Sequence, residues 1–95
     1  MLNRTVQRFR ADGVILDFID TYYQTSGYLT NPLVTLHTTA DPVVPYWHEA
    51  LYSAKVLATG SDSLYNHIPI PRYGHCNFTT SELLGSFAAL VYAVP

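Results

Sequence analysis

The alternation of helix-type and strand-type patterns constrains the fold of this chain more than any other feature. Apolar residues recur at helical spacing of three and four over residues 14–23, over residues 45–60 and again from residue 79 onward. Two short β-prone runs, Leu33–His37 and Tyr65–Pro71, lie between these helices. Helices that alternate with strands in this way favour βαβ connections and a parallel sheet. We therefore predict an α/β fold, ordered helix-strand-helix-strand-helix, with two parallel strands.

The composition is that of a folded chain with much apolar surface. Hydrophobic residues make up 48% of the 95 residues and charged residues only 13%. We expect one domain over residues 1–95, in which residues 1–13 form an irregular or helical arm. A chain of this size buries only about two-thirds of the surface that its unfolded form exposes. The excess of apolar side chains therefore favours a partner that covers part of them.

Several classes of function and location receive no support from the composition. The formal charge is −2, and no basic run is typical of a nucleic-acid-binding protein. No stretch reaches the roughly 18 apolar residues of a membrane span. Met1 is not followed by the apolar run of a signal peptide, and a single cysteine excludes an internal disulfide. We expect no membrane span and no cofactor, and the localisation stays open.

The two strands and the helix between them differ in their expected surroundings. Leu33–His37 is almost continuously apolar, as expected for a strand buried on both faces. Pro69 cannot donate a ladder hydrogen bond, so the strand Tyr65–Pro71 is expected at a sheet edge. In the helix near Pro45, a stripe spaced by three and four should face the core. This stripe consists of Val44, Trp47, Leu51, Ala54 and Ala58.

The helix boundaries follow local signals. Thr79 and Glu82 form the capping-box pattern of a helix start, and the apolar face of the helix that follows should lie on a sheet. Gly60 is expected to end the second helix, and Gly27 is a plausible stop after the first.

Two polar residues follow the two predicted strands at matching positions. Asp41 comes four residues after the first strand, and His75 comes four residues after the second. Functional groups of open α/β sheets collect beyond the carboxyl ends of the strands. Neighbouring strands lie about 4.8 Å apart, so a hydrogen bond between the two side chains is within reach. We predict that Asp41 and His75 lie side by side at the same edge of the sheet.

These two loops resemble the acid and histidine loops of the α/β-hydrolase family. Residues 32–45, Pro-Leu-Val-Thr-Leu-His-Thr-Thr-Ala-Asp-Pro-Val-Val-Pro, are similar to the family's seventh strand and acid loop. Residues 73–78, Tyr-Gly-His-Cys-Asn-Phe, are similar to its histidine loop, and the acid precedes the histidine as in the family. The resemblance covers residues 14–94. It implies a partial α/β-hydrolase fold whose two strands are equivalent to the last two of the family sheet.

The resemblance also implies an activity, which is the hydrolysis of small carboxylic esters. In the family, the histidine equivalent to His75 takes a proton from a serine hydroxyl, and the acid equivalent to Asp41 fixes the imidazole tautomer. The Gly-x-Ser-x-Gly motif that carries this serine does not occur in the chain. The nearest pattern, Gly60–Leu64, lacks the second glycine and follows a helix instead of a strand. We therefore expect the isolated chain to be weakly active or inactive. The alternative is a non-catalytic, self-associating folded fragment with idle remnants of a triad.

Other polar residues have competing interpretations. Cys76 beside His75 is either a nucleophile or a packed thiol, and packing is favoured because adjacent side chains in a loop usually point apart. Tyr46 and Trp47 line a substrate pocket or belong to the core, and Trp47 fits the core stripe. A zinc site would need His37, His48, His67 and Asp41, whose spacing matches no compact ligand pattern. Asp41 could instead cap the helix near Pro45.

The free edge of the first strand predicts self-association. In the parent fold the strand Leu33–His37 would be central, so one of its edges lacks a partner here. An exposed apolar edge is a template for pairing. Two copies that meet antiparallel across a two-fold axis would give a four-stranded sheet. We expect a homo-oligomer, most simply a dimer through the Leu33–His37 edge, with helix exchange as the alternative.

Overall fold

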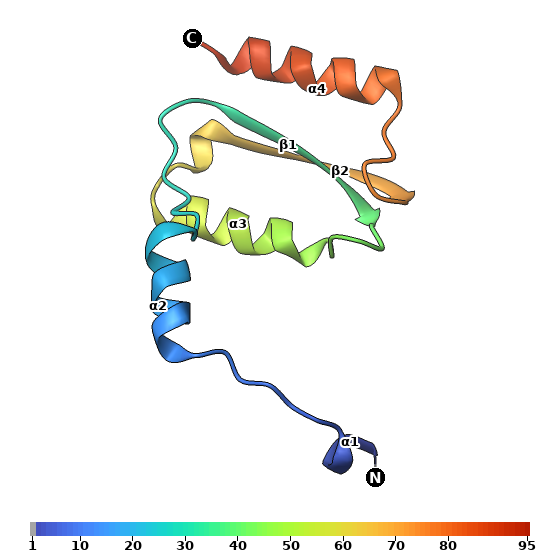
Figure 1. Cartoon of the computed structure of the whole chain (residues 1–95). Helices are drawn as coiled ribbons and strands as arrows, with labels where there is room; N and C mark the ends of the chain where they lie inside the picture. Colours follow the sequence, from blue (N-terminus) through green and yellow to red (C-terminus); the bar gives the residue numbers. More distant parts are fainter. Residues whose placement is uncertain (1) are drawn as a thin grey trace.

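A small parallel sheet lies between two helices. The computed structural model describes residues 2–95, in which strands β1 (Leu33–Ala40) and β2 (Tyr65–Tyr73) form one sheet. Helix α3 (Trp47–Ala58) covers one face, and helix α4 (Thr80–Ala93) covers the other (Figure 1). A short 3-10 turn, Asp62–Leu64, joins α3 to β2. The predicted α/β class and the two parallel strands are confirmed.

Both strands extend further than the sequence patterns indicated. The pairing runs from Leu33 opposite Tyr65 to Thr38 opposite Ile70, and after an irregularity it ends with Ala40 opposite Tyr73. Residues 38–40 therefore belong to β1, which continues beyond the predicted end of the strand at His37. Because the strands are parallel, their carboxyl ends share one edge of the sheet. Within residues 2–95, β2 is paired on one side only, in agreement with the edge position predicted from Pro69.

The N-terminal part of the chain extends away from the sheet. Helix α1 (Leu2–Thr5) and helix α2 (Gly13–Tyr22) are separated by residues without regular structure, and α2 buries no side chain (Figure 1). Asp12 caps α2 by accepting a 2.8 Å hydrogen bond from the Val14 amide. This extension contributes to the elongated dimensions of 53 × 31 × 17 Å.

Gly27 does not end helix α2 as predicted, because α2 already stops at Tyr22. It has a φ of +78°, and a Cβ atom at this position would lie 2.5 Å from the backbone carbon of Lys55. Glycine therefore lets the chain pass close against α3. Two side chains tie the same segment down, since Lys55 Nζ donates to the Thr25 carbonyl at 3.0 Å and Thr59 Oγ1 donates to the Gly27 carbonyl at 2.9 Å.

Helix α3 turns a different face to the sheet than its hydrophobic periodicity predicted. Val56 is fully buried, whereas Trp47 and Leu51 of the predicted stripe are 57% and 56% exposed. Trp47 therefore lies outside the core, and its ring stacks on His48 with centroids 4.0 Å apart. The face toward the sheet is partly polar, and Glu49 accepts a hydrogen bond from Tyr65 there. Pairing these polar groups outweighed burial of the apolar stripe.

Helix α4 begins where the capping box predicted. Thr79 Oγ1 accepts from the Glu82 amide at 3.2 Å, and Glu82 Oε2 accepts from the Thr79 amide at 2.8 Å. Arg72, near the end of β2, donates two 2.8 Å hydrogen bonds to the same carboxylate. These bonds attach the start of α4 to the end of the sheet at which both strands have their carboxyl ends.

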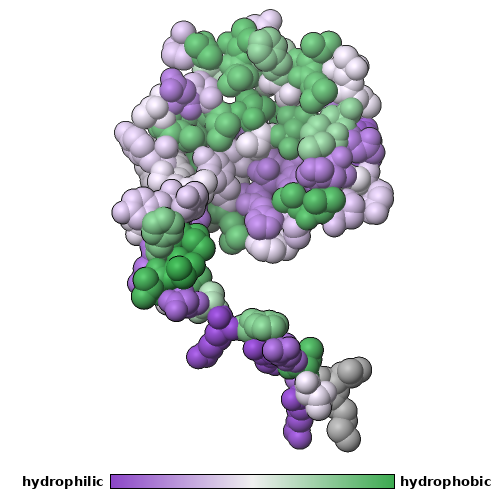
Figure 2. All heavy atoms as spheres, in the orientation of Figure 1, coloured by the Kyte–Doolittle hydropathy of each residue, from purple (hydrophilic) through white to green (hydrophobic). Residues whose placement is uncertain are grey.

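Much apolar surface stays uncovered. Val56 and Ile70 are the only hydrophobic side chains buried among the described residues. Figure 2 shows apolar residues gathered over the upper part of the molecule and on α2. The exposed large hydrophobic side chains of α4 are Leu83, Leu84, Phe87, Val91 and Tyr92. Within residues 2–95, no helix combines the length and the apolar character that crossing a bilayer needs.

Candidate active site

Asp41 lies directly after β1, and its two carboxylate oxygens have different partners. Oδ1 accepts hydrogen bonds from the amides of Val43 and Val44 at 2.8 and 2.9 Å. Oδ2 lies 2.9 Å from Nδ1 of His75. The Asp41 side chain is only 2% exposed. The carboxylate is therefore held in one orientation by its own loop and directed at one histidine.

Hydrogen bonding keeps this carboxylate ionised. Burial alone would raise the pKa of Asp41, because it disfavours the charged form. The amide of Val44, the ring of His75 and the amide of Val43 all donate to the charged form and outweigh burial. Together they hold the pKa of Asp41 well below its ordinary value. A fixed negative charge thus lies next to Nδ1 of His75.

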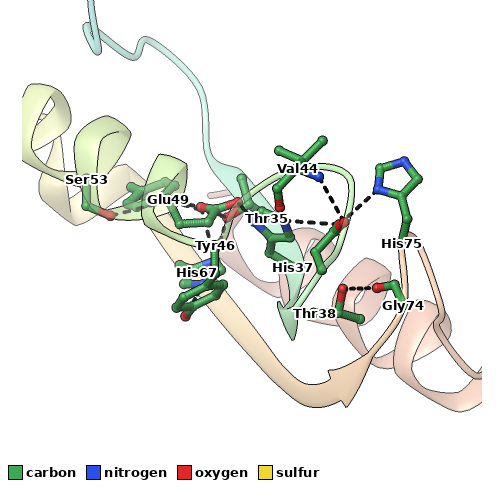
Figure 3. A network of polar contacts seen from close by, with 12 residues as sticks. Thr35, His37, Thr38, Val44, Tyr46, Glu49, Ser53, His67, Gly74 and His75 are labelled. Atoms are coloured by element: carbon green, nitrogen blue, oxygen red, sulfur yellow. Dashed lines mark hydrogen bonds and ion pairs between the residues drawn. The ribbon is translucent and has the colours of Figure 1, made fainter. Parts of the chain in front are cut away.

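The loop that carries His75 is fastened to the ends of both strands. The Gly74 amide donates to the Ala40 carbonyl at 3.2 Å, and the buried Thr38 hydroxyl donates to the Gly74 carbonyl (Figure 3). Asn77 Nδ2 donates to the Tyr73 carbonyl at 2.9 Å, and Arg72 donates to the Asn77 carbonyl at 2.7 Å. These four bonds hold the histidine loop over the end of β1, where Asp41 begins.

The predicted pairing of Asp41 with His75 is therefore found. The two residues lie at the same edge of a parallel sheet and are joined by a 2.9 Å hydrogen bond. Oδ2 of Asp41 accepts this hydrogen bond, so the ring proton of His75 lies on Nδ1. Nε2 is then the ring nitrogen that can accept a proton. The His75 side chain is 45% exposed, so the ring lies at the surface of the molecule.

A second polar network lies behind Asp41, and the sequence patterns did not predict it. Nε2 of His37 lies 3.4 Å from Asp41 Oδ2 and 3.1 Å from the Val44 carbonyl. On the other side of its ring, Nδ1 of His37 lies 3.6 Å from Glu49, which also contacts His67 at 3.2 Å (Figure 3). The one signal in the sequence was the four-residue spacing of His37 and Asp41.

The network continues along the face of the sheet toward α3. Thr35 Oγ1 donates to Glu49 at 3.1 Å and lies 2.9 Å from Nδ1 of His67. The Tyr46 hydroxyl lies 2.9 Å from Nε2 of His67, and Tyr65 donates to Glu49 at 2.8 Å. Tyr46 therefore belongs to this network and not to an open pocket near Asp41. The network fixes α3 on the sheet and places His37 against the catalytic candidate Asp41.

The histidines do not assemble into a metal centre. His37 and His67 face different oxygens of Glu49, while the exposed His48 stacks on Trp47. Across residues 2–95, no group of three or more histidine, cysteine, aspartate or glutamate side chains is arranged to hold a metal ion.

Cys76 differs from its prediction in two respects. The thiol is exposed instead of packed. Its Sγ lies 3.5 Å from Nε2 of His75, so the two adjacent side chains converge instead of pointing apart. The reason is the backbone of Cys76, whose φ of +50° lies in the left-handed region. Cys76 is the only non-glycine residue with a positive φ among the described residues.

The segment Gly60–Leu64 contains two serines, Ser61 and Ser63, and the first of them has a structural role. Ser61 is buried, and its hydroxyl accepts hydrogen bonds from the Leu29 amide at 3.0 Å and from Thr59 Oγ1 at 3.2 Å. Ser61 and Ser63 both precede β2, whereas His75 follows β2, so the serines and His75 lie at opposite ends of that strand. Neither serine is placed to give a proton to His75.

A hollow lined by α3 and by residues 24–25 is separate from the site. It is lined by Gln24, Thr25, His48, Leu51, Tyr52 and Lys55, and neither Asp41 nor His75 contributes to it.

Comparisons of the chain with protein-family models, with curated proteins and with solved structures gave no match.

Proposed function

We propose that this chain is the C-terminal portion of a serine α/β-hydrolase that acts on small carboxylic esters, in which it supplies Asp41 and His75 of the catalytic triad. The observation that carries the proposal is the pair itself. A nearly buried carboxylate, locked by two backbone amides, holds Nδ1 of an exposed histidine at 2.9 Å. The arrangement stands beyond the carboxyl ends of two parallel strands, where open α/β sheets carry their sites.

His75 and Asp41 would have different roles in the reaction. Nε2 of His75 would take the proton from a serine hydroxyl as it attacks the ester carbon, and would return it to the leaving alcohol. Asp41 would stabilise the imidazolium and keep the ring in the required tautomer. The chain has no Gly-x-Ser-x-Gly motif, so in the absence of that serine we expect His75 to act as a general base on water. Loss of even one oxyanion donor lowers a rate by about 10²–10³, so we expect slow hydrolysis by the isolated chain.

Hydrolysis of p-nitrophenyl acetate tests the proposal. The wild-type chain is compared with His75→Ala and with His48→Ala, which removes an exposed histidine that has no carboxylate partner in the described structure. The three chains are also compared in a Cys76→Ala background, so that the thiol contributes nothing. We expect slow turnover that falls to the buffer rate in His75→Ala and changes little in His48→Ala. Equal rates in all three chains, or efficient turnover that survives His75→Ala, would contradict the proposal.

A second candidate function is a non-catalytic, self-associating fragment. The observation that favours it is the exposed apolar surface of α2 and α4 beside a core that contains only Val56 and Ile70 as buried hydrophobic residues in the described part of the chain. The dependence of ester hydrolysis on His75 separates the two. Turnover that falls in His75→Ala supports an enzyme, whereas turnover indifferent to His75→Ala supports an idle remnant.

A further inference from the structure

Cys76, His75 and Asp41 stand in the order of nucleophile, base and acid. We propose that the Cys76 thiol is a nucleophile activated by the Asp41–His75 pair, so that this chain by itself forms a thioester with small activated acyl esters. The inference rests on the proposed role of the pair in proton transfer. It supplies a nucleophile within the chain, which has no Gly-x-Ser-x-Gly motif.

The distances connect the three side chains in one line. Sγ of Cys76 lies 3.5 Å from Nε2 of His75, and Nδ1 of the same ring lies 2.9 Å from Asp41 Oδ2. Each ring nitrogen therefore has one partner, a thiol on one side and a carboxylate on the other. A nucleophile within hydrogen-bonding reach of a base, with the base oriented by a third group, is the general geometry of nucleophilic catalysis.

The backbone at Cys76 is what brings the thiol to the ring. Its φ of +50° is uncommon outside glycine, and asparagine, aspartate and histidine are the residues that adopt it most readily. A turn alone would not favour cysteine here. The loop enforces the conformation through the Phe78 amide, which donates to the Cys76 carbonyl at 3.0 Å, and through the bond from Arg72 to the Asn77 carbonyl.

The thiol is also open to a reactant. The side chains of His75 and Cys76 are exposed, so an ester can approach from solvent.

The reaction balances with water as the only co-substrate. The Sγ proton moves to Nε2 of His75 while sulfur attacks the acyl carbon, so a C–S bond forms and the C–O bond to the alcohol breaks. The alcohol oxygen leaves with the proton from Nε2. Water then attacks the thioester and gives a proton to Nε2, the C–S bond breaks, and sulfur takes that proton back. The sum is ester plus water to acid plus alcohol.

Alkylation of the thiol by iodoacetamide tests activation without any ester. The measurement is made at about pH 6.5, well below the pKa of about 8.5 of a free cysteine. The folded wild type should react about tenfold or more faster than the same chain unfolded in urea, because unfolding removes the base from the thiol. His75→Gln and Asp41→Asn should lower the rate toward that of the unfolded chain, and His48→Gln should not. Equal rates for the folded and unfolded wild type would overturn the inference even if a variant failed to fold.

Acylation by p-nitrophenyl acetate tests the covalent step. Intact-mass measurement should show one acetyl group on the wild type, removable by hydroxylamine, and none on Cys76→Ala or His75→Gln. An unacylated wild type, or acylation that persists in Cys76→Ala, would overturn the inference. Slow hydrolysis that depends on His75 in the Cys76→Ala background would still support the proposed function, so the two can fail separately.

Discussion

At the scale of single residues, Asp41 does not cap the helix near Pro45, because α3 begins at Trp47 without a side-chain cap and Asp41 binds the amides of its own loop instead. Oδ1 caps the backbone of the following loop through Val43 and Val44, and Oδ2 holds His75. The first task fixes the carboxylate for the second, because a side chain locked by two amides cannot turn away from the imidazole. His37 lies 3.4 Å from Oδ2 and limits the remaining freedom from behind.

Replacing Asp41 by asparagine should reverse the tautomer of His75. An asparagine oxygen can still accept from Val43 and Val44, but its NH₂ group would then face Nδ1, where two donors cannot pair. The ring proton should move from Nδ1 to Nε2. In serine proteases the corresponding change lowers the rate about 10⁴-fold. Long-range ¹H–¹⁵N NMR of the His75 ring gives the tautomer directly. Asp62→Asn, in the exposed 3-10 turn, is the matched control, and the same tautomer in wild type and Asp41→Asn would contradict the assignment.

At the scale of elements, the histidine loop is short and anchored at both ends. Arg72 at the end of β2 pairs with Glu82 in the first turn of α4, and the loop runs between them. The hydrogen bond from Arg72, assisted by the Thr79 amide and opposed by burial, lowers the pKa of Glu82 from its ordinary value of 4.5 to about 2. The Glu82 carboxylate therefore holds the start of α4 and, through Arg72, also the loop that carries His75.

This depressed pKa predicts a pH-dependent stability. A carboxyl whose pKa is lower in the folded state stabilises the fold above its unfolded pKa and loses that contribution as the pH falls through its folded pKa. The wild type should lose stability between about pH 5 and pH 2. Glu82→Gln should be less stable at neutral pH and should show a flatter profile in that window. Thermal melts followed by circular dichroism at several pH values measure both.

Thr79→Ala is the matched control for Glu82→Gln. It breaks the other half of the capping box without removing a charge, and it should cost about 1 kcal/mol at neutral pH while most of the acid-induced loss of stability remains. A Glu82→Gln profile as steep as that of the wild type would show that another group causes the acid sensitivity.

At the scale of the whole molecule, the sheet and its helices do not cover their own apolar surface. The sheet has two strands, and α2 buries no side chain. Exposed aromatic and aliphatic residues extend over α2 and α4. Monomeric proteins rarely expose large contiguous apolar patches. Two surfaces stay uncovered within residues 2–95, which are the unpaired edge of β1 and the apolar faces of α2 and α4.

We predict that the isolated chain associates with itself, most simply as a two-fold dimer. Pairing of two β1 edges would satisfy their free backbone groups, and shared helix faces would add about 1.5–3 kcal/mol for each apolar side chain that becomes fully buried. Light scattering after size exclusion at micromolar concentration measures the mass. A monodisperse 10.6 kDa species with a cooperative melt would contradict the prediction.

The amino-acid sequence alone determined the features that rest on local patterns. The order of helices and strands, the parallel pairing and the capping box at Thr79 follow from periodicity and from side chains that bond to their own backbone. The hydrogen bond between Asp41 and His75 could also be predicted, because parallel neighbours bring their carboxyl ends to one edge whatever the exact strand lengths.

Only the tertiary structure decided which face α3 buries and where the thiol points. The apolar stripe of Trp47 and Leu51 lost to a polar face because Glu49 finds partners on the sheet, and sequence periodicity contains no information about such partners. Cys76 reaches Nε2 of His75 because a loop tied to two strands and a helix start forces its backbone into the left-handed region. That conformation is unfavourable for an isolated residue and persists only where the surrounding bonds enforce it.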